Sequence, residues 1–289
     1  MIIVTGATGL LGGQIVERLL DRVPAERVGV SVRDPDKATA RSFADRGVRV
    51  RRGSFTDGAG LAHAFEGASQ ILIVSVDRMG AETVRQHRTA IDAAVAAGAR
   101  RIVYTAQMGA SPTSRFQACR DHAATEEALA ASGVAWTSLR NGFHAASGLH
   151  FLAEGLASGE VALPADGPVC WTAHADLAEA AAVILADEGR FEGPTPPLTA
   201  TEALTFADLA AAAADVTGRA VARTTAPDDV FRARLVSAGV PDETAGHLLS
   251  IFAAAREHEF ATADPTLAKL IGREPVSVRE LLRDQLTGG

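Results

Sequence analysis

The sequence predicts an α/β fold, with a parallel sheet covered by helices on both faces and a smaller, mostly helical C-terminal lobe. Three observations indicate this class. Short β-branched runs alternate with segments of helical periodicity through the first half of the 289 residues. A glycine-rich turn separates the first strand from the first helix. The expected strands are nearly continuous apolar runs, which is typical of parallel sheets buried on both faces.

The elements follow in a regular order. The expected strands are short and rich in Val and Ile, at residues 2–4, 28–32, 48–51, 71–74, 101–105 and 135–139. Helical spacing between them predicts helices at residues 11–22, 61–65, 82–97 and 122–131. Gly98 and Gly133 would end the last two helices.

The pattern changes after Arg140, where helical segments dominate. Four residues have the side chains and positions expected of helix N-caps, namely Thr205, Asp228, Asp264 and Ser277. Gly239 and Gly272 are expected helix ends. We therefore expect a nucleotide-binding domain over residues 1–142 and a smaller lobe over residues 143–289. The boundary is soft because the lobe is expected to share strands with the sheet.

Composition excludes several functions. The net charge is -7 and no Lys/Arg-rich block offsets it, so no nucleic acid partner is expected. Charges or glycines interrupt every apolar stretch, and no leader-like segment follows Met1, so we expect no membrane partner and a cytoplasmic location. Cys119 and Cys170 lack metal-site spacing, which predicts reduced, partly buried thiols and no metal.

The first turn carries a nucleotide-binding pattern. In the segment Val4–Gly12, Gly6 permits a tight turn and Gly9 lets backbone N–H groups approach a diphosphate. Gly12 permits close packing of the helix on the strand, and the helix N-terminus supplies positive potential. A glycine triplet alone is a weak signal, but its position between a strand and a helix indicates a Rossmann-type dinucleotide site.

The end of the second strand indicates which dinucleotide binds. NAD sites usually place an acidic residue there, whereas this strand ends in Arg33 with Lys37 one turn further on. Arg33 could pair with a 2′-phosphate, so NADP(H) is preferred over NAD(H). The alternatives are that Arg33 is a solvated surface charge or that Asp34 binds a ribose hydroxyl.

The catalytic Tyr-x-x-x-Lys pair of many short-chain reductases is missing. The only tyrosine is Tyr104, inside the fifth strand, and the two lysines are Lys37 and Lys269. Chemistry that needs a deprotonated tyrosine is therefore disfavoured. Hydride transfer to an electrophilic acceptor, such as a quinone or a delocalised cation, remains.

His122 falls near the position where that lysine would project. It could hydrogen-bond the nicotinamide ribose or help protonate a reduced product. The alternative is a structural histidine paired with Glu126 one helical turn on.

Several motifs in order resemble one family. Residues 5–12, 32–37, 122–126 and 139–143, with the helix start at 174–176 and the segment 267–272, resemble the NmrA-like atypical short-chain reductases. Within that family they are most similar to type 2 NAD(P)H:quinone oxidoreductases and triphenylmethane reductases.

The resemblance implies a set of site residues. The implied cofactor contacts are Gly6, Thr8, Gly9, Leu10, Leu11, Arg33, Val74, Ser75, Val76, Thr105 and Ala106, with Phe55 able to stack nearby. The implied substrate cleft lies near Asn141 and Phe143, and Asn141 is also a catalytic candidate, although an asparagine there often serves a turn. Three residues depart from the family pattern: Leu10, Ser54 and His174. Trp136 and Trp171 are expected in the core.

Two functions stay open. One is an NADPH-dependent reductase that passes hydride to a quinone-like or conjugated small-molecule acceptor without a Tyr/Lys pair. The other is a non-catalytic, redox-sensing NADP(H)-binding regulator of NmrA type. A second copy of the chain, in a homodimer, is a further candidate partner.

Overall fold

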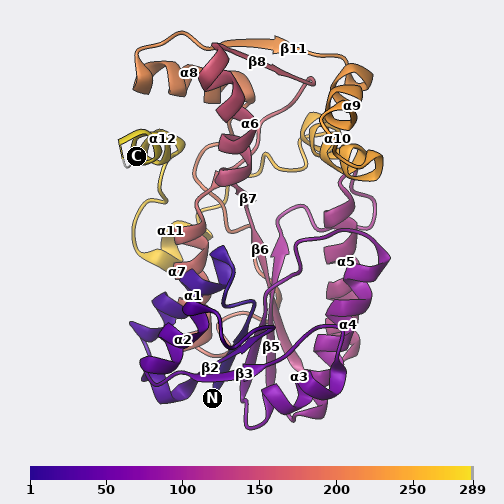
Figure 1. Cartoon of the computed structure of the whole chain (residues 1–289). Helices are drawn as coiled ribbons and strands as arrows, with labels where there is room; N and C mark the ends of the chain where they lie inside the picture. Colours follow the sequence, from indigo (N-terminus) through magenta and orange to yellow (C-terminus); the bar gives the residue numbers. More distant parts are fainter. Residues whose placement is uncertain (288–289) are drawn as a thin grey trace.

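One large parallel sheet dominates the computed structural model, which describes residues 1–287 (Figure 1). Its seven strands run in the order β10-β6-β5-β4-β1-β2-β3, and every neighbouring pair is parallel. This confirms the predicted fold class. The strands are β1 (Ile2–Thr5), β2 (Val28–Val32), β3 (Arg49–Arg52), β4 (Gln70–Ile73), β5 (Arg101–Gln107), β6 (Ala135–Asn141) and β10 (Gly193–Pro194).

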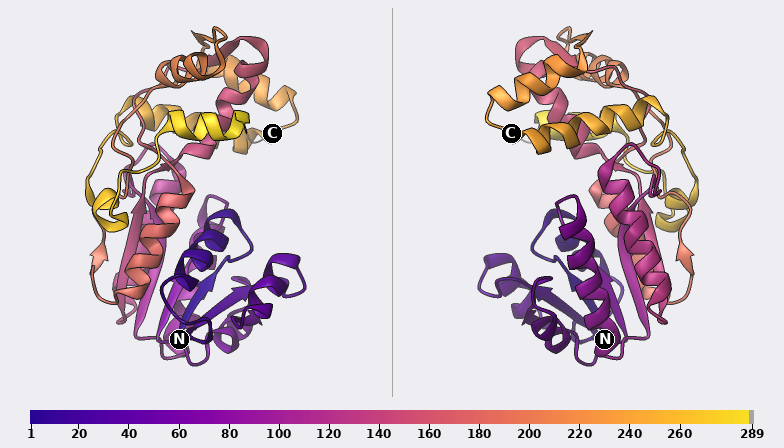
Figure 2. Two further views of the ribbon diagram at one scale, coloured as in Figure 1. Left: turned by 90° about the vertical axis from the view of Figure 1, so that its left-hand side faces the viewer. Right: turned by 90° about the vertical axis from the view of Figure 1, so that its right-hand side faces the viewer.

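Helices cover both faces of the sheet (Figure 2). Successive strand side chains point to opposite faces, so Ile2 and Val4 join one apolar cluster and Ile3 joins another. The first cluster lies under α1 (Leu10–Leu20), α2 (Ala38–Asp45), α7 (His174–Ala186) and α11 (Thr266–Ile271). The second lies under α3 (Gly58–Phe65), α4 (Ala81–Ala96) and α5 (Gln117–Ala131).

α5 begins earlier than predicted. The helix starts at Gln117, whereas the sequence pattern indicated a start at residue 122. Phe116 and Cys119 are buried in the apolar cluster of the upper lobe. This packing stabilises a first turn that has no side-chain cap.

The upper lobe stands over the carboxyl ends of the strands (Figures 1 and 2). It contains α6 (Ala145–Ser158), α8 (Phe206–Thr217), α9 (Asp228–Ser237), α10 (Asp242–Arg256) and α12 (Val278–Thr287). Two small parallel pairs accompany these helices, β8 (Glu160–Leu163) with β11 (Ala222–Thr225), and β7 (Phe143–His144) with β9 (Trp171–Thr172). The sequence pattern predicted neither pair.

Two of the expected helix caps are confirmed. Thr205 and Asp208 form a reciprocal capping box at α8, and the Ser277 hydroxyl accepts from the Glu280 N–H at the start of α12. The expectation for Asp228 is wrong by one residue, because Pro227 precedes α9 as the N-cap. Asp264 Oδ1 accepts from the Thr266 N–H at 2.8 Å, as expected of a cap, and Pro265 with helical φ and ψ directly precedes α11.

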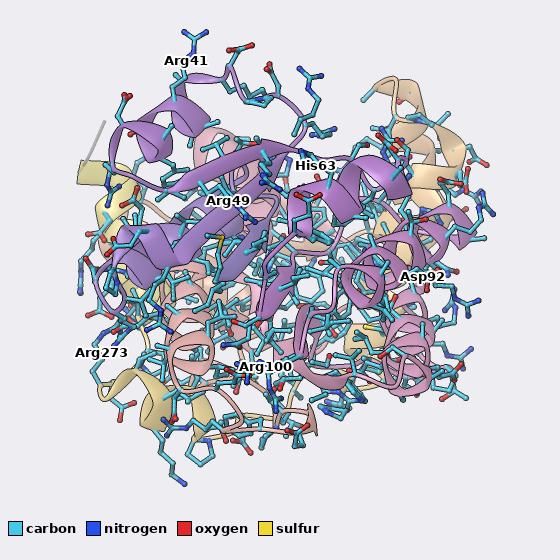
Figure 3. The ribbon with its side chains drawn as sticks, turned by 90° about the horizontal axis from the view of Figure 1, so that it is seen from below. Arg41, Arg49, His63, Asp92, Arg100 and Arg273 are labelled. Carbon is cyan, nitrogen blue, oxygen red and sulfur yellow. The ribbon has the colours of Figure 1, made fainter. Side chains whose placement is uncertain are left out.

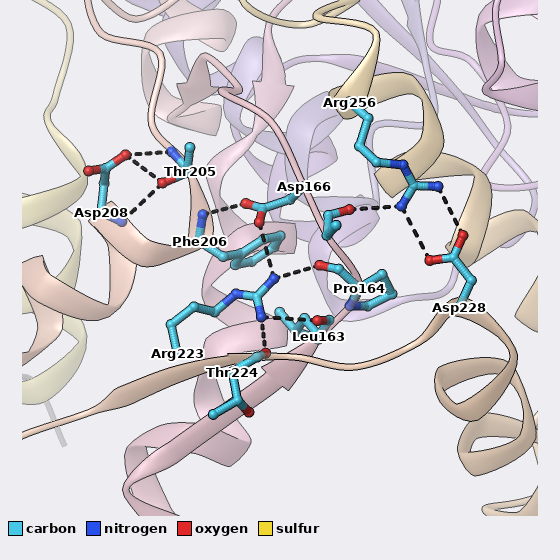
Figure 4. A network of polar contacts seen from close by, with 11 residues as sticks. Leu163, Pro164, Asp166, Thr205, Phe206, Asp208, Arg223, Thr224, Asp228 and Arg256 are labelled. Atoms are coloured by element: carbon cyan, nitrogen blue, oxygen red, sulfur yellow. Dashed lines mark hydrogen bonds and ion pairs between the residues drawn. The ribbon is translucent and has the colours of Figure 1, made fainter.

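Arginines brace the upper lobe (Figure 4). Arg223 of β11 donates to Asp166 Oδ1 at 3.1 Å, while the other carboxylate oxygen of Asp166 accepts from the Phe206 N–H. Asp228 binds the Arg256 guanidinium at 3.2 and 2.9 Å instead of capping α9. These contacts tie β11 to α8 and α9 to α10.

The amino ends of the strands form the opposite side of the molecule (Figure 3). Arg49 and Arg100 lie there, and Arg49 donates to the carbonyl oxygens of Ala64 and Glu66. No helix within residues 1–287 has both the length and the apolar character needed to cross a membrane.

The chain returns from the upper lobe to complete the sheet. Gly193 and Pro194 pair with Thr137 and Ser138 of β6, and α7 packs on α1. The domain boundary expected between residues 142 and 143 stays a prediction. Elements that follow residue 142 contribute both to the sheet and to the upper lobe.

Candidate functional site

Two adjoining cavities lie at the carboxyl edge of the sheet. The glycine-turn cavity, about 750 Å³, is lined by residues 5, 6, 8–12, 31–33, 53–56, 74–78 and 86. The histidine cavity, about 700 Å³, is lined by five histidines, by apolar and amide side chains, and by the charged residues Asp77, Arg78 and Asp121. Both share Gly9, Leu10, Leu11 and residues 74–78, so one elongated ligand can span them.

The glycine turn has the geometry of a diphosphate cradle. Gly6 has φ of +62°, and a Cβ on Gly12 would lie 2.3 Å from the Gly6 carbonyl oxygen. The Gly9 N–H donates to that same oxygen at 2.9 Å. Gly9 has no side chain to cap α1, so the first N–H groups of the helix are free for an anion. These residues fit a dinucleotide.

The far end of the glycine-turn cavity gathers the residues expected at the adenine ribose. Arg33 is exposed at the end of β2, beside Ser54 and Phe55. Asp34 accepts a hydrogen bond from the Asp36 N–H. Lys37 stands apart from this group. It is exposed at the start of α2 and lines neither cavity.

Two threonine hydroxyls shape the wall between the cavities. Thr5 Oγ1 accepts from the Val74 N–H, and Thr105 Oγ1 accepts from the Ser75 N–H, each at 2.9 Å. The predicted segment Val74–Val76 is thereby held against both cavities. Thr105 and Ala106 line the histidine cavity.

A buried polar cluster stands behind His122. Its Nδ1 lies 2.6 Å from the Tyr104 hydroxyl, which is also 3.3 Å from His87 Nδ1. Burial lowers the pKa of His122 to about 3 and that of His87 to about 4, and burial raises the pKa of Tyr104. At neutral pH all three side chains are uncharged.

The expected pairing of His122 with Glu126 is wrong. Glu126 does not pair with His122, because its carboxylate accepts from Ser138 and from the Arg140 guanidinium.

Asn141 ends β6 and lies in the histidine cavity, together with the predicted Phe143 and His122. Its backbone continues the sheet and accepts from the Met108 N–H, so it does not form a turn. Asn141 Oδ1 is buried without a hydrogen-bond partner, and so are Thr83 Oγ1 and Gln107 Nε2 of the same lining. Unpaired buried polar atoms cost about 1–3 kcal/mol each, and a polar ligand would satisfy them.

His174, one of the three residues that depart from the family pattern, packs against a second histidine. Its ring lies against that of His144, with centroids 4.1 Å apart. Burial lowers the pKa of both rings, that of His144 to about 3. The cavity wall therefore carries neutral rings here.

Some of the lining residues were not predicted. They include His87, His144 and His150, which come from three separate segments. A single histidine on a helix or strand gives no signal of its position, but five of the eight histidines gather here. As predicted, Trp171 is buried, Trp136 is partly buried against the core, and both cysteines are buried and free of disulfides.

A glycine turn at a helix N-terminus, opening on a cavity beside the strand ends, defines a Rossmann-type dinucleotide-binding protein. The chain belongs to the NmrA-like family, whose model matches residues 1–280.

Known proteins of this family are similar over nearly the whole chain. Quinone oxidoreductase 2 of Escherichia coli (strain K12) is 35% identical over 281 residues, covering 97% of this chain and 96% of that protein. A crystal structure of the NADPH-dependent quinone oxidoreductase from E. coli, complexed with NADPH, has a TM-score of 0.92 and 34% identity, covering 99% of this chain and 100% of the other. The Citrobacter sp. triphenylmethane reductase complexed with NADP(H) has a TM-score of 0.89 and 32% identity, covering 99% of each chain.

Proposed function

We propose that this protein is an NADPH-dependent reductase that transfers hydride to a quinone-like or conjugated small-molecule acceptor. The observation that carries the proposal is the continuity of the two cavities. A dinucleotide whose diphosphate lies at the glycine turn can extend past residues 74–78 into the histidine cavity. Bound NADPH would supply the hydride there.

The walls of the histidine cavity suit a flat, conjugated ring. Phe116 and Phe143 lie with ring centroids 5.9 Å apart, and Phe151, Leu248 and Ile251 add further apolar surface. Such walls exclude water and align a ring with the dinucleotide, which lowers the barrier through orientation.

The polar groups of the cavity can bind acceptor oxygens without changing charge. His122 and His144 are neutral at pH 7 because burial lowers their pKa values. The Tyr104 hydroxyl, whose pKa is raised, is bound to His122 and cannot serve as a deprotonated base. Hydride transfer must therefore rely on an acceptor that is already electrophilic.

The preference for NADP(H) over NAD(H) rests on Arg33. Arg33 lines the glycine-turn cavity, and so do Ser54 and Thr56. A 2′-phosphate there could pair with the Arg33 cation and accept from the Ser54–Thr56 hydroxyl pair, whose oxygens lie 2.9 Å apart.

The decisive experiment follows NADPH absorbance at 340 nm with a panel of small benzoquinones, naphthoquinones and triphenylmethane dyes. We expect acceptor-dependent oxidation of NADPH by the purified protein. Tight NADPH binding without oxidation by any acceptor would instead support the regulatory alternative. No binding of either dinucleotide would contradict both functions.

A further inference from the structure

The hydrogen bonds behind His122 run in one direction. The Val76 N–H can only donate, so His87 Nε2 accepts at 3.1 Å and carries no proton. A neutral His87 then carries its proton on Nδ1. Thr125 Oγ1 donates to the Asp121 carbonyl oxygen at 2.8 Å and therefore accepts from His87 Nδ1 at 3.0 Å.

The same reasoning assigns the proton of Tyr104. Its hydroxyl oxygen faces His87 Nδ1, which already carries a proton, and Thr125, whose Oγ1 already accepts from His87. The shortest contact of the hydroxyl is with His122 Nδ1, at 2.6 Å. Tyr104 therefore donates to His122 Nδ1, and the proton of a neutral His122 must lie on Nε2.

The Nε2 edge of His122 faces the histidine cavity. The ring lines this cavity, and its Nδ1 is turned inward to Tyr104. Among the side chains that the structure describes, the hydrogen bond of the His122 ring is the one between Nδ1 and the Tyr104 hydroxyl. His122 therefore presents a neutral donor of fixed direction to the cavity, whose lining also holds the unpaired acceptor Asn141 Oδ1.

We propose that Tyr104 is a positioning residue that holds His122 as its Nε2–H tautomer, so that His122 donates a hydrogen bond to an oxygen of the bound ligand. That oxygen belongs either to the acceptor carbonyl or to a hydroxyl of the nicotinamide ribose. Tyr104 thus orients His122 without changing its own protonation state.

A fixed donor has a chemical use in the proposed reaction. When hydride adds to a conjugated carbonyl compound, an electron pair moves to the carbonyl oxygen. A neutral N–H directed at that oxygen stabilises the developing charge, and water supplies the proton that completes the product. This inference rests on the proposed function only for its kinetic consequences.

The test reads the tautomer directly. Long-range ¹⁵N–¹H correlation spectra of ¹⁵N-histidine-labelled protein at pH 7, assigned with His122→Gln, distinguish the two neutral tautomers. We expect the Nε2–H form for His122 in the unmodified protein, and a mixture of tautomers in Tyr104→Phe. The Nδ1–H or doubly protonated form in the unmodified protein overturns the proposal, and so does an unchanged Nε2–H form in Tyr104→Phe.

Kinetic and binding constants show whether the ligand oxygen belongs to the acceptor or to the nicotinamide ribose. In Tyr104→Phe we expect about a tenfold loss, the equivalent of one hydrogen bond. A lower kcat/KM for the acceptor with unchanged NADPH Kd assigns the acceptor carbonyl, and a raised NADPH Kd assigns the ribose. No change in either quantity overturns the proposal.

Thr137→Val is the matched control. It removes a buried hydroxyl that donates to the Phe191 carbonyl oxygen at 2.7 Å, away from both cavities. We expect a loss of stability without a change in the His122 spectrum. If the unmodified protein reduces no acceptor, the proposed function fails, whereas the spectra and the NADPH Kd still decide the role of Tyr104.

Discussion

Arg140 and Glu126 form a two-point ion pair between β6 and α5. Arg140 Nε lies 3.1 Å from Glu126 Oε1, and the terminal nitrogen NH2 lies 2.7 Å from Oε2. α5 carries His122 and β6 ends in Asn141, so this pair sets the spacing between two lining residues of the histidine cavity.

Replacing Arg140 should show how much this ion pair contributes to the free energy of unfolding. In Arg140→Met the carboxylate of Glu126, whose side chain is only 10% exposed, stays buried without its cation. We expect the free energy of unfolding to fall by about 3 kcal/mol, measured by urea denaturation. Arg100→Met, which removes an exposed pair with Glu188, should change it by less than about 1 kcal/mol. Equal losses in both variants would contradict the assigned role.

Dinucleotide preference should depend on Arg33. Arg33→Ala removes the cation expected at the 2′-phosphate, and we expect the Kd for NADPH to rise about 10- to 100-fold with little change for NADH. Fluorescence titration with both dinucleotides measures this. Arg41→Ala is the control, because Arg41 is exposed, lines neither cavity and pairs with Asp36. The same rise for both dinucleotides would contradict the assignment.

A methyl group at the glycine turn should abolish dinucleotide binding. In Gly12→Ala the new Cβ would lie 2.3 Å from the Gly6 carbonyl oxygen, so the turn or α1 must shift. Calorimetry should then detect no NADPH binding. Gly246→Ala in α10 meets no atom within 4 Å, and it should retain binding and gain up to about 1 kcal/mol of stability. Normal binding by Gly12→Ala would refute the cradle geometry.

Acid should destabilise the protein through His87. Its pKa is lowered from 6.5 to about 4 by burial. As the pH falls below 6.5 the unfolded chain binds this proton before the folded chain does, so the free energy of unfolding decreases until about pH 4. The slope from this one group is at most about 1.4 kcal/mol per pH unit. Urea denaturation between pH 7.5 and 4.5 should give a shallower slope for His87→Gln, and identical slopes would contradict this role.

Sequence patterns predicted those parts of the site that depend on local chain geometry. The glycine turn, its strand and its helix are contiguous, so their spacing alone indicated the cradle that the structure contains. The end of β2 was located in the same way, and Arg33, which follows it, lines the glycine-turn cavity.

The rest depended on contacts between distant segments. His87, Tyr104 and His122 come from α4, β5 and α5, and only the packing of α4 and α5 on β5 brings their rings together. The true partner of Glu126 was missed for the same reason, because Arg140 lies on another element. The start of α5 depended on the burial of Phe116 and Cys119 in the upper lobe, which no local signal revealed.

The chain returns from the upper lobe to the sheet through α7 and β10, and this limits which truncations and domain exchanges the protein can tolerate. Truncation after residue 142 would remove the outermost strand and strip α1 of its helical neighbour, exposing apolar side chains such as Ile15 and Leu19. The upper lobe therefore cannot be removed or exchanged as an independent domain. New acceptor preferences must be built by substitutions within the cavity walls, since grafting a foreign lobe would also replace part of the nucleotide-binding scaffold.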